Sequence, residues 1–265
     1  MDLLVCCKIV PDLDLLSDHD WVVPDHGRID VSFVRTMVNP YDESALELAL
    51  RAAEGAGPEP VRLSALSIGT RQADPALKTL LALRFDRVVR MEPGADLGFC
   101  PEAVAELIAG FVRERPQDAL LMGQQSGEGD HGKTPFLVAE RLGWPCVTEV
   151  IRVEAAPGRR LRITSRVDRG LLTQTLRPPC VLCVGNVAGS ALRVPTLKDR
   201  MVHGQRPIER IPVEPDLESW KQDYALGTLT RIGHARAGRI LRGLDAGALA
   251  GTLFDQWLQS RLAAL

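Results

Sequence analysis

Short strand-like segments alternate with amphipathic stretches through the first half of the chain. They lie at 3–7, 61–68, 86–91 and 119–122. The first is an unbroken apolar run, which is typical of a strand buried on both faces. The amphipathic stretches predict helices near 42–52, 73–84, 102–115 and 135–142, the first of them capped by Asp42 or Ser44. Strands that alternate with helices indicate βα units. The sequence therefore predicts an α/β fold with a parallel sheet and helices on both faces.

The pattern changes after Pro145. Three consecutive strands with turns between them are predicted over 147–154, 159–166 and 171–177, and Cys180–Val184 is another buried strand. We therefore expect one α/β domain over 1–184, with a partly antiparallel extension over about 147–177. No amphipathic period is found over 185–233, and so long an irregular stretch is unusual inside a compact domain. We expect 185–265 to form an arm that embraces a partner, ending in a helix over 246–262.

Charge and composition exclude several classes of protein. Lys+Arg total 32 and Asp+Glu 34, a net charge of -2, whereas nucleic-acid binding requires a basic field. No apolar stretch approaches the roughly 20 residues that span a bilayer, and no secretory signal is found, so we expect no direct membrane insertion. The six cysteines lie mostly in or beside apolar runs. They predict reduced core thiols and a cytoplasmic location.

The segment from Gly123 to Thr134 is the candidate binding loop. It follows a strand and opens a helix, at the edge where open α/β sheets bind ligands. Its glycines allow close approach of the backbone, and N–H groups at a helix start form an anion site. Lys133 and Thr134 would add a cation and a hydroxyl. These features favour a cradle for an adenine nucleotide.

Two other interpretations of this loop stay open. Gly127–Thr134 fits the phosphate-loop pattern G-x-x-x-x-G-K-[ST]. In that arrangement Glu128 and Asp130 would face the phosphates, and no later strand supplies a second metal ligand. The segment could also be a solvated glycine loop, in which His131 would be an exposed residue and not a phosphate contact.

The chain offers no constellation that predicts acid–base or nucleophilic catalysis, and no metal site is expected. Cys180 and Cys183 have the spacing of a redox or metal pair. On a strand, however, positions i and i+3 face opposite sides. No catalytic residue is therefore predicted.

Five segments, in order along the chain, together resemble one family. Leu3–Asp12 is similar to its opening strand, and Asn39–Glu47 to its N-P-(aromatic)-x-E helix start. Gly123–Asp130 stands where the family has G-x-Q-[AS]-x-D-x-D. Val167–Leu171 with Leu176–Pro179 resembles V-D-G-G-L…L-x-L-P, and Arg236–Gly238 resembles R-x-A-G. The family is the beta subunit of electron transfer flavoprotein.

The resemblance implies a Rossmann-like sheet of the adenine nucleotide alpha-hydrolase type. It implies a heterodimer with an alpha subunit that holds redox FAD, while the beta subunit binds AMP without a redox role. Electrons would pass from flavin dehydrogenases through the FAD to a quinone oxidoreductase. By similarity, AMP would lie against Cys6, Asn39, Pro40, Tyr41, Asp42, Ile68, Gly123, Gln124, Gln125, Ser126, Gly127, Glu128, Gly129, Asp130, His131, Gly132, Lys133 and Thr134.

The sequence departs from the family at several positions. Lys133 stands where glutamine is usual, and Gly189–Arg193 replaces a segment whose leucine anchors dehydrogenases in the family, with Leu192 a candidate substitute. Two alternatives remain. One is an electron-bifurcating subunit that binds a second FAD in place of AMP. The other is a stand-alone adenine-nucleotide-binding module.

Overall fold

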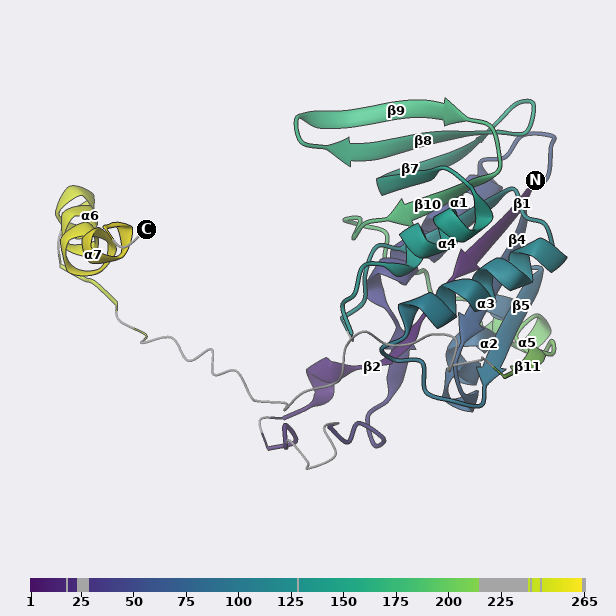
Figure 1. The fold of residues 1–265 in the computed structure, drawn as a ribbon, viewed down its shortest axis with the longest axis horizontal. Coiled ribbons are helices and arrows are strands. Elements are labelled where there is room, and N and C mark those ends of the chain that lie inside the picture. The colour runs from purple at the N-terminus through teal and green to yellow at the C-terminus, as the bar shows by residue number, and fades with distance from the viewer. Residues whose placement is uncertain are drawn as a thin grey trace.

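The computed structural model describes residues 1–17, 19–22, 29–127, 129–214, 238, 240–243 and 245–263. A nine-stranded sheet with the order β11-β5-β4-β1-β6-β10-β7-β8-β9 is its centre (Figure 1). Seven strands from β11 to β7 run parallel, and β8 and β9 are antiparallel. The α/β prediction is confirmed. The strands are β1 (Asp2–Cys6), β4 (Arg62–Ile68), β5 (Arg87–Pro93), β6 (Ala119–Gly123), β7 (Cys146–Ala156), β8 (Arg160–Val167), β9 (Gly170–Leu176), β10 (Cys180–Val184) and β11 (Glu209–Val213).

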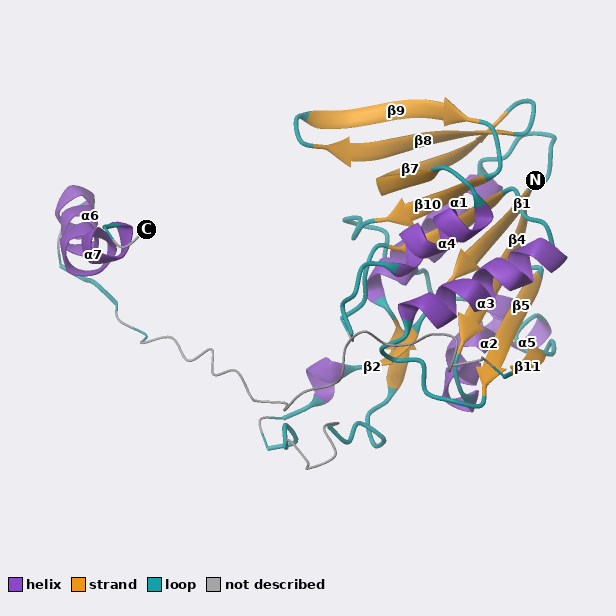
Figure 2. Cartoon of the chain, viewed as in Figure 1, coloured by secondary structure: helices purple, strands orange, loops and turns teal. Residues whose placement is uncertain are grey.

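Two pairs of helices cover the two faces of the sheet (Figure 2). They are α1 (Pro40–Glu54) and α2 (Asp74–Ala82) on one face, and α3 (Pro101–Glu114) and α4 (Thr134–Leu142) on the other. Successive strand side chains point to opposite faces. Leu3 therefore packs in the core under α1 and α2, and Leu4 in the core under α3 and α4.

All four helices carry proline in their first turn. Proline suits this position because the missing N–H has no partner within the helix. Helix α1 begins at Pro40 with Asn39 as its N-cap residue. The predicted caps were therefore placed too late: Asp42 and Ser44 are both buried inside the helix and make contacts with other segments.

The stretch after β10 differs from the expected arm. Residues 197–202 form helix α5 (Leu197–Val202), which packs beside α2, and β11 joins the sheet next to β5. A short strand at the sheet edge that contains Pro212 has neither an unbroken apolar run nor a helical period, so the pattern did not reveal it. Residues 215–237 of the predicted arm lie outside the described residues.

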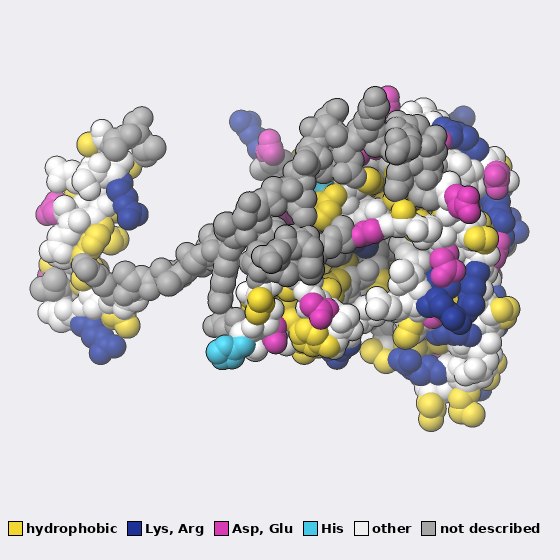
Figure 3. All heavy atoms as spheres, turned by 60° about the horizontal axis from the view of Figure 1, so that its bottom comes forward, with side chains coloured by type: hydrophobic (Ala, Val, Ile, Leu, Met, Phe, Trp, Pro, Cys, Tyr) yellow, Lys and Arg dark blue, Asp and Glu magenta, His cyan; other side chains and the backbone are white. Residues whose placement is uncertain are grey.

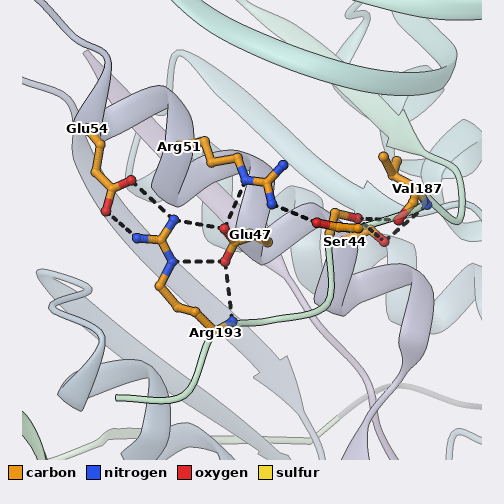
Figure 4. A network of polar contacts seen from close by, with 8 residues as sticks. Ser44, Glu47, Arg51, Glu54, Val187 and Arg193 are labelled. Carbon is orange, nitrogen blue, oxygen red and sulfur yellow. Dashed lines mark hydrogen bonds and ion pairs between the residues drawn. The ribbon is translucent and has the colours of Figure 1, made fainter. Parts of the chain in front are cut away.

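A polar clasp fastens this stretch to α1 (Figure 4). Arg193 donates from Nε to Glu47 Oε2 at 3.0 Å, and Arg51 donates to Glu47 Oε1 at 2.9 Å. Ser190 donates from Oγ to Ser44 Oγ at 2.8 Å. Two guanidinium groups therefore neutralise the buried Glu47 carboxylate. Leu192 packs against the core of its own chain, so it is a poor substitute for a free anchor.

Two smaller parts complete the structure. Strands β2 (Ile9–Pro11) and β3 (Thr36–Val38) form an antiparallel pair beside the sheet. The C-terminal helix predicted over 246–262 is present as α6 (Ala246–Leu253), one π-helical turn over Phe254–Leu258, and α7 (Gln259–Leu262). Asp245 caps α6 by accepting the N–H of Ala248 at 2.9 Å. Figure 1 shows this helical segment apart from the sheet domain.

Candidate functional site

A cavity of about 630 Å³ lies at the carboxyl ends of β1, β4, β5 and β6. Strand order reverses here, because the chain builds outward from β1 to β5 and then returns to β6 on the other side of β1. Such a reversal is where open α/β sheets bind ligands. Figure 3 turns this edge toward the viewer and shows hydrophobic side chains beside acidic ones on it.

Asp42 joins three walls of the cavity. Its Oδ2 accepts the backbone N–H of Lys8 at 2.8 Å and Nδ2 of Asn39 at 3.1 Å. Its Oδ1 accepts the backbone N–H of Gly123 at 2.8 Å. Burial raises the pKa of this carboxyl from 3.8 to about 6, although the three hydrogen bonds and the nearby Lys8 charge oppose the shift. One carboxyl thus ties the ends of β1 and β6 to the start of α1.

The raised pKa predicts a pH-dependent stability. Between pH 4 and 6 the folded protein keeps the Asp42 proton that the unfolded chain has lost, so the contribution of this group to stability falls as pH rises. We expect the unfolding free energy of wild type, relative to that of Asp42→Asn, to fall by about 2 kcal/mol from pH 4 to pH 7. Urea unfolding across this range measures it. A difference that does not change with pH would contradict the assignment.

Position 123 requires glycine because the backbone of β6 comes very close to the start of α1 there. A Cβ at this position would clash with the Asp42 carboxylate and lie 2.8 Å from Cβ of Tyr41 and 2.9 Å from the Asp42 nitrogen. A side chain would therefore separate β6 from α1. The glycine at the strand end keeps the β6 backbone against the helix start.

Asn39 presents an unused acceptor at the cavity. Its Nδ2 donates to the carbonyl of Gln125 at 2.8 Å, which fixes the orientation of the amide. The residue is 1% exposed and lines the cavity, and its buried Oδ1 has no hydrogen-bond partner among the described residues. Buried polar atoms are rarely left unpaired. A ligand that donates a hydrogen bond, such as a hydroxyl or an amine, fits this atom.

The glycine loop runs from the end of β6 to the start of α4. Gly129, Asp130 and Gly132 have φ of 80°, 42° and 60°, a region that glycine and short polar residues tolerate. Lys133 and Thr134 stand at the first turn of α4 and line the cavity. In this turn Pro135 has no N–H, and the N–H groups of Phe136 and Leu137 already donate to the Lys133 carbonyl at 3.1 Å. The groups here that suit a phosphate are therefore the Lys133 ammonium and the Thr134 hydroxyl.

Five of the six cysteines are buried thiols, and Cys146 is half-buried. Burial raises the pKa of Cys6 and Cys7, at the end of β1, well above the usual range. Burial likewise raises the pKa of Cys180 and Cys183 to about 12. All four thiols are therefore protonated near neutral pH, which does not suit a nucleophile or a metal ligand.

The structure brings most of the predicted site residues to one cavity. Those that line it are Cys6, Asn39, Asp42, Ile68, Gly123, Gln124, Gln125, Ser126, His131, Gly132, Lys133 and Thr134. Pro40, Tyr41, Gly127, Gly129 and Asp130 are near it in the chain but do not line it. Glu128 lies outside the described residues.

One wall of the cavity was missed by the sequence analysis. Residues 93–98, between β5 and α3, line it together with Pro101, Val104 and Ile108 of α3. Leu66 and Met122 add to the apolar surface on the sheet side. In sequence, Val104 and Ile108 are indistinguishable from core positions of an amphipathic helix. The position of this loop at a strand's carboxyl end was the available signal.

Comparison with known proteins agrees with this fold. The model of the electron transfer flavoprotein domain matches residues 30–216. The electron transfer flavoprotein subunit YgcR of Escherichia coli K12, whose name marks that assignment as provisional, is 33% identical over 99% of both chains. The beta subunit of Bradyrhizobium diazoefficiens is 30% identical over 69% of this chain and 70% of its own. The mitochondrial beta subunit of Arabidopsis thaliana is 27% identical over 92% and 95%.

These matches define a protein built around an electron transfer flavoprotein domain. More particularly, the chain belongs to the electron transfer flavoprotein family, with beta subunits among its relatives. Within the described residues, every helix is too short or too polar to cross a membrane.

Proposed function

We propose that this chain is the beta subunit of a heterodimeric electron transfer flavoprotein and holds AMP in the cavity at the sheet's carboxyl edge. The observation that carries the proposal is the position of this cavity, at the strand-order reversal and against the first turn of α4. Several beta subunits resemble the chain over most of its length.

The two ends of the cavity differ in the chemistry they favour. Leu66, Ile68, Val104 and Ile108 give an apolar end that suits a heterocyclic base. The Lys133 ammonium and the Thr134 hydroxyl give an end that suits a phosphate. Between them, Asn39 Oδ1 would accept a hydrogen bond from the ligand. This order of groups matches a nucleoside monophosphate.

The proposed role needs no acid–base chemistry from this chain. Bound FAD supplies the electron transfer, and the protein contributes binding, orientation and electrostatics. In the proposed heterodimer the alpha subunit holds this flavin. Electrons would enter from flavin dehydrogenases and leave to a quinone oxidoreductase.

A second candidate ligand is FAD in this chain's own cavity. Two observations favour it: the cavity continues from the start of α4 to the wall made by α3, and Lys133 adds a cation where the family usually has glutamine. A dinucleotide would use both. In that case the protein would be an electron-bifurcating flavoprotein that accepts electrons from NADH.

Counting the cofactors tests both candidates. The chain is co-expressed with its alpha subunit, the complex is purified and denatured, and the released FAD and AMP are quantified per heterodimer. One FAD and one AMP would support the first candidate. Two FAD without AMP would support the second. A chain that binds nucleotide but forms no complex would contradict the heterodimer and leave a stand-alone module.

An exposed apolar ridge is the candidate docking surface for a dehydrogenase. The clasp on α1 ends at Arg193, and the next residues present Val194, Leu197 and Met201 to solvent, with Leu197 74% exposed. We expect Leu197→Glu to slow flavin reduction by acyl-CoA dehydrogenases at least tenfold while the FAD and AMP contents stay unchanged. Leu15→Glu, at another exposed leucine, is the control. Equal rates for both variants would exclude this ridge.

A further inference from the structure

Two loops that line the cavity meet at His131. The loop before α3 contributes Gly98 and Phe99, and the glycine loop before α4 contributes His131. Nε2 of His131 lies 3.2 Å from the carbonyl oxygen of Gly98. The rings of His131 and Phe99 stand edge to face with centroids 5.8 Å apart. Because a carbonyl oxygen only accepts, Nε2 is the protonated nitrogen in this contact.

The glycine loop is shaped to allow this approach. Gly129 has φ of 80°, and a Cβ there would lie 3.1 Å from Nε2 of His131 and 3.4 Å from the Gly98 oxygen. Asp130 follows with φ of 42° and accepts a hydrogen bond from Nε2 of Gln125 at 2.9 Å. The backbone before His131 is therefore turned and fixed so that the imidazole reaches across to the other loop.

The contact between the two loops lies at the wall of the cavity. Gly98 and His131 both line the cavity, and they belong to connections that leave different strands, β5 and β6. A nucleotide with its base against α3 and its phosphate at α4 would touch both loops at once. Separation of the loops would widen the cavity on this side, and closure would keep the ligand in place.

We propose that His131, with Gly129, forms a latch between these loops and that the latch governs how fast a nucleotide leaves the cavity. The proposal rests on the proposed nucleotide site. His131 is a positioning residue here, since it acts by holding Gly98. The size of the expected effect follows from the loss of one hydrogen bond and one ring contact. Without them, nucleotide release should be about threefold to tenfold faster.

The latch is tested first without any ligand. Hydrogen exchange is measured on the heterodimer freed of nucleotide, for wild type and His131→Ala. We expect faster exchange over 94–100 in the variant and unchanged exchange in the central strands. Gly129→Ala should act in the same direction, because its Cβ would displace the imidazole. Unchanged exchange over 94–100 in both variants would overturn the proposal, whatever the cavity binds.

Release is then measured with fluorescent N-methylanthraniloyl-AMP, displaced by excess AMP in a stopped-flow instrument. His131→Ala should release it about threefold to tenfold faster than wild type. His131→Gln, whose amide can still donate to Gly98, should restore most of the wild-type rate, and His203→Ala should have no effect. Equal release rates for wild type and His131→Ala would contradict the latch. If wild type binds no AMP analogue, the proposed ligand is wrong, and the exchange experiment still decides the loop contact.

Discussion

Gly123→Ala should abolish the nucleotide binding proposed for the cavity and lower the free energy of unfolding by about 2 kcal/mol. The added methyl group would meet the Asp42 carboxylate and the backbone of α1, which are buried and cannot move aside cheaply. Either β6 shifts or the Asp42 hydrogen bond to the Gly123 N–H breaks. Both outcomes disturb the cavity at the junction of β1, β6 and α1. Urea unfolding and nucleotide content of the purified complex measure the two effects.

The chain provides matched controls for this substitution. Gly69 also lines the cavity, and Gly127 lies in the glycine loop between β6 and α4. A Cβ at either position would meet no atom within 4 Å. Neither has a positive φ that would strain alanine. Gly69→Ala and Gly127→Ala should therefore change stability by less than about 0.5 kcal/mol. A similar loss in all three variants would show that the effect does not come from the close approach.

Asp74→Ala should be strongly destabilising, because it leaves a buried cation with one carboxylate fewer. Arg90 on β5 is 0% exposed, and its Nε lies 2.9 Å from Oδ1 of Asp74 at the start of α2. Nη1 lies 3.2 Å from Glu92 Oε1, a more exposed carboxylate. Removal of one partner from a buried ion pair costs about 3–5 kcal/mol. With Glu92 still present we expect about 3 kcal/mol, measured by urea unfolding.

A double-mutant cycle separates the charge from the shape of the side chains. Arg90→Met keeps an unbranched apolar side chain in place of the buried cation. The double variant Arg90→Met/Asp74→Ala should therefore be more stable than Asp74→Ala alone, by about 1–2 kcal/mol. Glu102→Ala, in the first turn of α3, controls for the loss of an acidic residue at a helix start and should cost at most about 1 kcal/mol. If the double variant were less stable than Asp74→Ala, the loss of stability in Asp74→Ala would not come from leaving the Arg90 charge without its partner.

The central fold was predictable because its signals are local. Runs such as 3–7 and 119–122 are buried on both faces, so hydrophobicity alone marks them as strands. The stretch after residue 185 gave no such signal. Strand β11 lies at an edge, and α5 has only six residues. Contacts with residues distant in sequence, such as that of Arg193 with Glu47, hold this stretch in place. A periodic pattern of hydrophobic residues does not predict such contacts.

Residue patterns alone marked only one side of the candidate site. The glycine loop has an unusual composition and follows a strand, so the sequence marks it. The resemblance added Cys6, Asn39, Asp42 and Ile68, which also line the cavity. The hydrogen bonds of Asp42 could not be predicted, because its partners Lys8 and Gly123 are far away in sequence. Val104 and Ile108 look like ordinary core residues of an amphipathic helix. Their place at a cavity depends on the curvature of the sheet and the loop before α3, which only the folded chain defines.

The place of β11 beside β5 bears on how the protein is made. Its Glu209 pairs with Arg87, which is 122 residues earlier in the chain. During synthesis β5 is therefore an open sheet edge until residue 213 has left the ribosome. Open edges can pair with other chains, and contacts between distant segments form slowly. Nascent chains that stop before residue 209 should consequently aggregate more readily than chains that extend past residue 213, even though they already contain every strand that borders the cavity.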